Sequence, residues 1–88
     1  MANIRSQMKR NRQAPARRAR NRSIKTEIHT RTKQALSAAQ SGDAAAAREA
    51  LLSAQKRIDS AVAKGVLHRN TAARRKSRLA KEVAALLG

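Results

Sequence analysis

Residues 24–62, IKTEIHTRTKQALSAAQSGDAAAAREALLSAQKRIDSAV, contain two helical patterns separated by a turn signal, and this arrangement decides the fold. In the first pattern the apolar residues lie within about 60° on a helical wheel of about 100° per residue; they are Ile24, Ile28, Ala35 and Ala39, with Leu36 at the edge. Ser41-Gly42-Asp43 predicts a turn, because Gly42 suits a left-handed helix end and Asp43 suits the cap of the next helix. In the second pattern one face carries Ala44, Ala47, Leu51, Ala54, Ile58, Ala61 and Val62.

A third helical pattern follows a second glycine. Gly65 predicts the end of the second helix and Asn70 is a candidate cap for the third, whose inner stripe is Ala72, Leu79, Val83 and Leu86. We therefore predict helices over about 15–41, 44–63 and 71–87 in an all-α, antiparallel three-helix bundle. At 1.5 Å per residue, the second and third helices are ~28 Å and ~25 Å long and the apolar part of the first, 24–40, is ~26 Å. Any helix before Ile24 must then overhang the bundle.

The amino-terminal region is cationic throughout. Residues 5–25 contain nine cations and no acid: Arg5, Lys9, Arg10, Arg12, Arg17, Arg18, Arg20, Arg22 and Lys25. The only large apolar residues in this window are Met8 and Ile24, so it has no hydrophobic face with which to dock on its own chain. Pro15 is expected to interrupt the helix. We expect residues 1–23 to form a basic RNA-binding arm, disordered when free, and residues 24–88 to form the bundle.

The free bundle is expected to be marginally stable. Thirteen large apolar residues from Ile24 onward supply roughly 20–40 kcal/mol if all are fully buried. Ordering about 65 residues costs roughly 65–130 kcal/mol of backbone entropy, which hydrogen bonds and alanine burial must help to offset. We therefore predict that the free protein is only marginally folded and that binding to its partner orders it.

The charge balance points to a polyanionic partner. The chain has 88 residues, 21 Lys and Arg, 5 Asp and Glu, and a formal net charge of +16. Arginine is twice as common as lysine, and its planar fork matches phosphate oxygens. There is no Phe, Trp or Tyr, so base-stacking platforms are excluded and recognition must use backbone, shape and grooves. Residues 26–63 are nearly neutral while 64–81 contain seven cations and no acid, so we expect the first and third helices to face RNA and the second to face solvent.

Other classes of function receive little support. Two distant histidines and no cysteine make no metal site, no cofactor motif is present, and neither a carboxylate pair nor an activated Ser or Thr indicates catalysis. No run approaches the roughly 18 apolar residues of a membrane span, and no secretory signal is recognised. We predict a non-enzyme in the cytoplasm, without membrane or small-molecule partners. An Arg-rich, acid-free amino terminus is also typical of organelle transit peptides.

The strongest local signal is AKGVLHRNTAARRKSRL, residues 63–79. Gly65 allows the backbone to turn, and Val66 and Leu67 can pack against the end of the bundle. Polar groups at the start of the next helix can bind phosphate. Arg74, Arg78 and Lys81 form an outer row. The alternative interpretation is a solvated basic face. His68 is a candidate phosphate donor or a satisfied turn residue, whereas His29 beside Ile28 is interpreted as structural.

Three features together carry a resemblance to a known family: residues 63–79, the opening Met1-Ala2-Asn3-Ile4-Arg5-Ser6 with Lys9-Arg10, and the 41–43 turn. Over essentially its whole length the chain resembles the family of bacterial small-subunit ribosomal protein twenty. The resemblance implies a three-helix bundle with a long first helix that binds 16S ribosomal RNA directly, early in assembly, with few protein neighbours. By position it implies RNA contacts at Asn3, Arg5, Ser6, Lys9, Arg10, Arg12, Arg17, Arg18, Arg20, Arg22, Lys64, His68, Asn70, Arg74, Lys76 and Arg78. The charge pattern adds Lys25, Arg69 and Arg75. Pro15 departs from the family pattern, so a straight first helix is not expected.

The expected function is a structural constituent of the small ribosomal subunit, on the ribosome in the cytoplasm, that stabilises 16S RNA folding. A histone-like, non-specific DNA-binding protein is the alternative, since it needs the same charge. A membrane-active basic helix is a third class, disfavoured because cations crowd all sides of the arm and aromatic anchors are absent.

Overall fold

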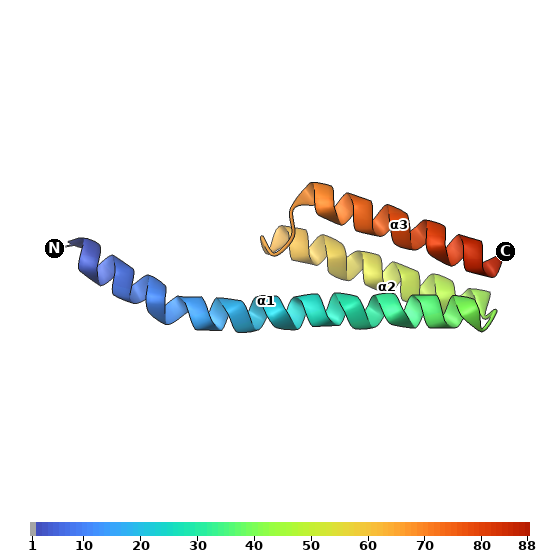
Figure 1. Cartoon of the computed structure of the whole chain (residues 1–88), viewed down its shortest axis with the longest axis horizontal. Helices are drawn as coiled ribbons and strands as arrows, with labels where there is room; N and C mark the ends of the chain where they lie inside the picture. The colour runs from blue at the N-terminus through green and yellow to red at the C-terminus, as the bar shows by residue number, and fades with distance from the viewer. Residues whose placement is uncertain (1) are drawn as a thin grey trace.

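A computed structural model describes the backbone of residues 2–88 and the side chains of residues 14–88. Over residues 2–88 the chain forms three helices and no strand: α1 (Ala2–Gln40), α2 (Ala44–Ala63) and α3 (Arg69–Leu87). Figure 1 shows α2 antiparallel to both neighbours, with α1 and α3 running in the same direction. The predicted all-α, antiparallel three-helix bundle is therefore confirmed.

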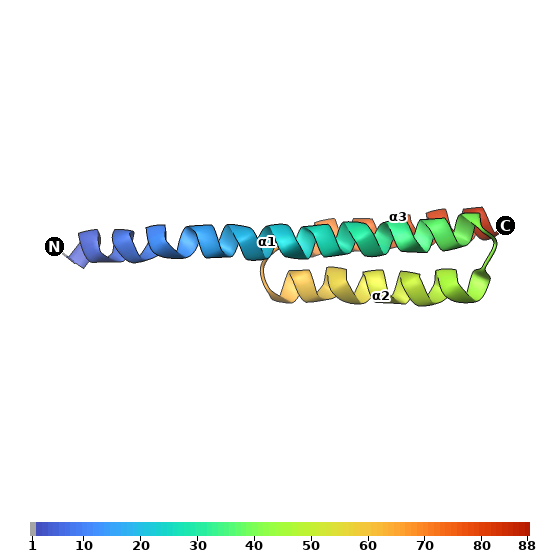
Figure 2. The same ribbon diagram turned by 90° about the horizontal axis from the view of Figure 1, so that it is seen from below.

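The bundle occupies only one end of an elongated molecule. The principal extents of the whole molecule are 63 × 20 × 13 Å, and the longest of them follows α1. The turn between α1 and α2 lies at the same end as the carboxyl terminus, while α3 begins beside the middle of α1 (Figures 1 and 2). The amino-terminal half of α1 thus overhangs the bundle, as the helix lengths predicted.

The first helix does not restart at Pro15. We expected a helix over about 15–41, but α1 runs from Ala2 to Gln40 with Pro15 inside it. Proline lacks the N–H that would bond to the carbonyl of Asn11 and its ring crowds that carbonyl, which kinks a helix without having to end it. Figure 1 shows such a change of direction in the blue, amino-terminal part of α1. Disorder of this arm in the absence of RNA stays a prediction.

The turn between α1 and α2 is built as the sequence predicted. The N–H of Gly42 donates to the Ala39 carbonyl and the N–H of Asp43 donates to the Ala38 carbonyl, both at 3.1 Å. This pair of bonds defines a Schellman motif, and Gly42 occupies its left-handed position with φ of 80°. The Asp43 carboxylate accepts a bond from the Ala46 N–H at 3.1 Å and so caps α2.

The connection between α2 and α3 repeats the glycine motif but ends differently. Gly65 has φ of 75°, and the half-buried Val66 and Leu67 pack against the bundle as predicted. The third helix begins at Arg69 instead of residue 71, and its cap is His68 instead of Asn70. The reason is that His68 takes an extended backbone (φ −72°, ψ 144°) and its Nδ1 accepts the N–H of Asn70 at 3.1 Å, which draws two more residues into the helix.

The core is small and rich in alanine. Among the described side chains the buried apolar ones are Ile28, Ala35, Ala39, Ala47, Ala54, Ile58, Ala61, Ala72, Leu79 and Val83. Alanine lets the helices approach closely but buries little apolar surface. Most of the large apolar residues counted in the sequence are only partly covered. The predicted inner positions Ala44 and Leu86 are exposed, Leu86 to 44%. Both lie in a terminal helical turn, where neighbouring helices no longer cover them.

Candidate nucleic-acid interface

The overhanging part of α1 presents cations to solvent. The side chains predicted as RNA contacts in its described part are all exposed: Arg17, Arg18, Arg20, Arg22 and Lys25. The predicted contacts Asn3, Arg5, Ser6, Lys9, Arg10 and Arg12 lie outside the residues whose side chains the structure describes. Residues 14–25 contain no acid, so this part of α1 supplies no carboxylate of its own to compete with phosphate.

The second cationic surface covers α3 and the loop before it. The predicted contacts that are exposed here are Lys64, His68, Arg69, Asn70, Arg74, Arg75 and Arg78. Arg74, Arg78 and Lys81 line one shallow hollow on the outer side of α3, in agreement with the row expected from their spacing. Lys76 differs, because its side chain is half-buried and its Nζ lies 2.7 Å from the Asp59 carboxylate on α2. Lys76 therefore has an anionic partner on another helix, whereas Arg78 pairs with Glu82 on its own helix.

Two of the five carboxylates tie neighbouring helices together. Glu27 on α1 pairs with Arg57 on α2 at 3.1 Å, and the Asp59–Lys76 pair joins α2 to α3. Exposed pairs of this kind stabilise by at most about 1 kcal/mol each, but they favour one register of the helices. Both of these pairs include a residue of α2, whereas on α3 the Arg78 side chain pairs with Glu82 of the same helix at 3.0 Å.

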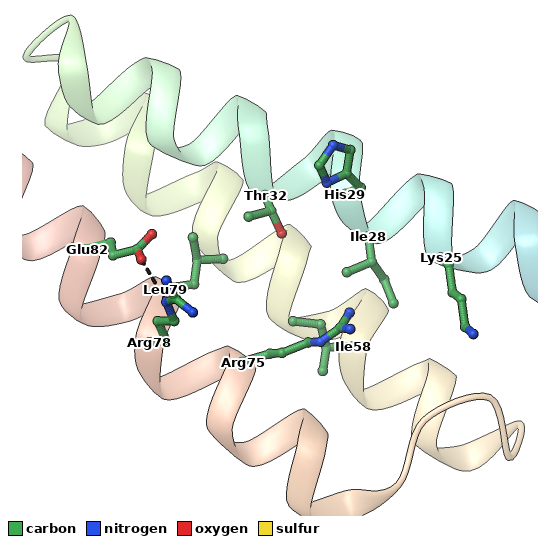
Figure 3. A pocket seen from close by; sticks show the side chains of 9 residues that line it. All are labelled: Lys25, Ile28, His29, Thr32, Ile58, Arg75, Arg78, Leu79 and Glu82. Atoms are coloured by element: carbon green, nitrogen blue, oxygen red, sulfur yellow. Dashed lines mark hydrogen bonds and ion pairs between the residues drawn. The ribbon is translucent and has the colours of Figure 1, made fainter.

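The two basic segments meet in a groove between α1 and α3. A pocket of about 470 Å³ opens there, with Lys25 on one wall and Arg75 and Arg78 on the other. Figure 3 shows the Arg75 side chain extending from α3 across Ile58 toward α1, and Lys25 extending from α1 into the same space. Segments that are about 50 residues apart in the chain thus present their cations to a single site.

The sequence did not reveal three polar residues of this groove. His29 was interpreted as structural, and Thr32 and Glu82 were not considered, yet all three line the pocket, and the Thr32 hydroxyl points into it (Figure 3). A signal was present: His29 and Thr32 lie four and seven residues after Lys25, which places the three on one face of a helix. Which face α3 would cover could not be read from that spacing.

The hydrogen bond made by His68 fixes how its ring can act. Because Nδ1 accepts the amide of Asn70, the neutral imidazole carries its proton on Nε2. The exposed ring can therefore cap α3 and still donate one hydrogen bond outward. The two interpretations of His68, phosphate donor and turn residue, are compatible.

Other kinds of site are not indicated by the described part of the chain. Within it no three His, Cys, Asp or Glu side chains gather in a way that could hold a metal ion. No helix found there combines the length and the apolar character needed to cross a bilayer.

The described part of the chain is an elongated helical bundle with two cationic surfaces, an arrangement typical of small, basic proteins that bind polyanions. The chain belongs to the ribosomal protein S20 family, whose model matches residues 2–84. Membership of a ribosomal protein family confirms the resemblance noted in the sequence, and it confirms the prediction that the protein is not an enzyme.

Relatives match along nearly their whole length. The chain is 48% identical over 84 residues to the small ribosomal subunit protein bS20 of Salinispora tropica, covering 96% of each chain. It is 46% identical over 88 residues to the protein of that name from Streptomyces avermitilis, covering 100% of both. Against the one from an Anaeromyxobacter species (strain K), identity is 51% over 84 residues, covering 96% of this chain and 92% of the relative.

Proposed function

We propose that this chain is a constituent of the small ribosomal subunit in the bacterial cytoplasm, where it binds 16S ribosomal RNA directly and stabilises RNA folding during assembly. The observation that carries the proposal is the meeting of two acid-free cationic segments at the α1–α3 groove. The relatives' name, small ribosomal subunit protein, supports the same assignment.

The proposed mechanism is electrostatic clamping. Exposed arginines displace the counterions condensed on RNA phosphates, and this release supplies most of the binding free energy. The α1 overhang reaches beyond the bundle, so one protein can contact RNA segments that are well separated. The bundle holds the α1 and α3 surfaces at a fixed spacing, and we expect α2, which is nearly neutral, to face away from the RNA.

Salt dependence of binding tests the clamp. Affinity for a 16S RNA transcript should fall steeply as salt rises, and Arg18→Ala or Arg74→Ala should each reduce the slope of log K against log salt by about 1. Arg48→Ala is the matched control, since Arg48 is an exposed arginine on α2 outside both surfaces. Binding that is insensitive to salt, or equal slope changes in all three variants, would contradict the mechanism.

Competition between nucleic acids tests the partner. In a gel-shift assay at moderate salt, excess duplex DNA should displace the protein from 16S RNA far less effectively than unlabelled 16S RNA does. Equal displacement by DNA would favour the histone-like alternative and reject direct, preferential binding to ribosomal RNA.

A further inference from the structure

The α1–α3 groove contains groups that a site for phosphate alone would not need. Its walls carry cations, but also the Thr32 hydroxyl and the Glu82 carboxylate. A carboxylate repels phosphate, so Glu82 weakens a site of pure charge attraction. The groove should therefore bind something that contains a phosphate and also a hydrogen-bond donor.

The Glu82 carboxylate is held in place and is only partly shielded. Its Oε1 accepts a bond from Arg78 Nε at 3.0 Å, and the side chain remains 42% exposed. An ionised carboxylate has about four acceptor sites, so this bond leaves acceptor capacity toward the groove. Arg78 acts here as a positioning residue for Glu82.

The cationic and the hydrogen-bonding ends of the groove are separated in register on both walls. Lys25 and Thr32 are seven residues apart on α1, and so are Arg75 and Glu82 on α3. Seven residues span about 10 Å along a helix. The groove thus has a cationic end formed by Lys25 and Arg75, and a hydrogen-bonding end near Thr32 and Glu82 (Figure 3).

The floor of the groove is firm. It is formed by Ile28, Ile58 and Leu79, which are all at most 3% exposed and belong to the core. A floor of packed core side chains does not rearrange around a ligand, which favours discrimination by shape and hydrogen bonding. The volume of about 470 Å³ lies in the range of sites that hold one small molecule.

We propose that this groove seats one ribonucleotide of the RNA backbone, with its phosphate between Lys25 and Arg75 and an adjoining ribose 2′-hydroxyl bound by Thr32 and Glu82. The inference rests on the proposed RNA binding and extends it, because the 2′-hydroxyl, both donor and acceptor, is the group that distinguishes RNA from DNA at a given site. The Glu82 carboxylate accepts from that hydroxyl, and the Thr32 hydroxyl satisfies its oxygen.

The test compares a short oligouridine with its 2′-deoxy counterpart, which has the same phosphates and bases. One hydrogen bond to a charged group corresponds to roughly tenfold to a hundredfold in affinity, so the full-length protein should bind the ribose form tighter by at least about tenfold. Thr32→Val and Glu82→Ala should bring the ratio of the two affinities close to one. The controls are Thr30→Val on the exposed side of α1 and Glu49→Ala on the exposed side of α2, which should leave the ratio unchanged.

Glu82→Ala gives the sharpest outcome, because charge alone and hydroxyl recognition predict different results. Removing a carboxylate strengthens binding of any polyanion, so charge alone predicts the same gain for both oligonucleotides. The proposal predicts a gain for the deoxy form and a loss, or a much smaller gain, for the ribose form. A wild-type ratio of one, or a ratio unchanged in both groove variants, would overturn it. Since binding to 16S RNA is measured separately, the groove can fail while the proposed function stands.

Discussion

The most exacting prediction on the fold concerns Ile58→Ala. Ile58 is 1% exposed and is the largest side chain that the described part of the chain buries this completely. It contacts a cluster containing Ile28, Ala61 and Ala72, and it forms part of the floor of the α1–α3 groove. One substitution therefore tests the core and its connection to the binding surface.

The expected loss follows from this environment. Removing the outer carbons of a buried isoleucine costs roughly 2–5 kcal/mol, the higher values applying where the cavity cannot collapse. Its cluster includes two alanines, which have no rotamers with which to fill the space, but also four partly buried side chains that can relax, so we expect a loss near the middle of that range; the four are Ile24, Val62, Val66 and Leu67. Because 1 kcal/mol shifts Tm by about 4–8 °C in a domain of this size, the Tm should fall by at least roughly 10 °C.

Thermal unfolding followed by far-ultraviolet circular dichroism measures this loss, with and without saturating 16S RNA. RNA should raise the Tm of the variant, and the apparent affinity of the variant should be lower by its folded fraction. Leu52→Ala is the control, because Leu52 lies on the same helix and is 61% exposed; its cost should stay within about 0.5 kcal/mol. If Ile58→Ala unfolds at the wild-type temperature, or if Leu52→Ala costs as much, the described core is wrong.

Three further predictions concern the helix ends and the kink. Gly65→Ala should destabilise the bundle by about 1–2 kcal/mol in urea titrations, because φ of 75° is strained for alanine although no atom lies within 4 Å of the added carbon; unchanged stability would refute this. His68→Ala should cost about 0.5–2 kcal/mol through loss of the cap, whereas His68→Asn should keep the stability; His68→Ala should also weaken RNA binding, and retained affinity in this variant would exclude the outward Nε2 donor. Pro15→Ala should increase the helix signal in circular dichroism, since proline inside a helix costs about 3 kcal/mol, and a decrease would contradict the kinked helix.

The local features of the fold were predictable, since their signals lie within a few residues of one another. The turn at Gly42 and Asp43 follows from a left-handed glycine and a capping carboxylate, and the structure confirms both. The cap of α3 was predicted two residues too late. Asparagine is the stronger general cap, but the backbone after Gly65 places His68, and not Asn70, at the position where its side chain can accept an amide.

What sequence could not supply is the pairing of distant faces. The groove joins residues 25–32 with residues 75–82, and its register depends on the packing of α1 and α3 over α2. Helical spacing gave the face of each helix but not the angle at which the helices meet. For that reason Thr32 and Glu82 could not be predicted as site residues. Lys76 could not be distinguished from the neighbouring cations until the structure showed its pairing with Asp59.

Chemical footprinting of the 16S RNA backbone, with and without the protein, tests the central claim most directly. Two cationic surfaces at fixed spacing should protect a few confined backbone segments, and Arg18→Ala and Arg74→Ala should each weaken a different subset. Absence of protection at saturating protein, or weak uniform protection along the whole molecule, would contradict direct binding by this clamp.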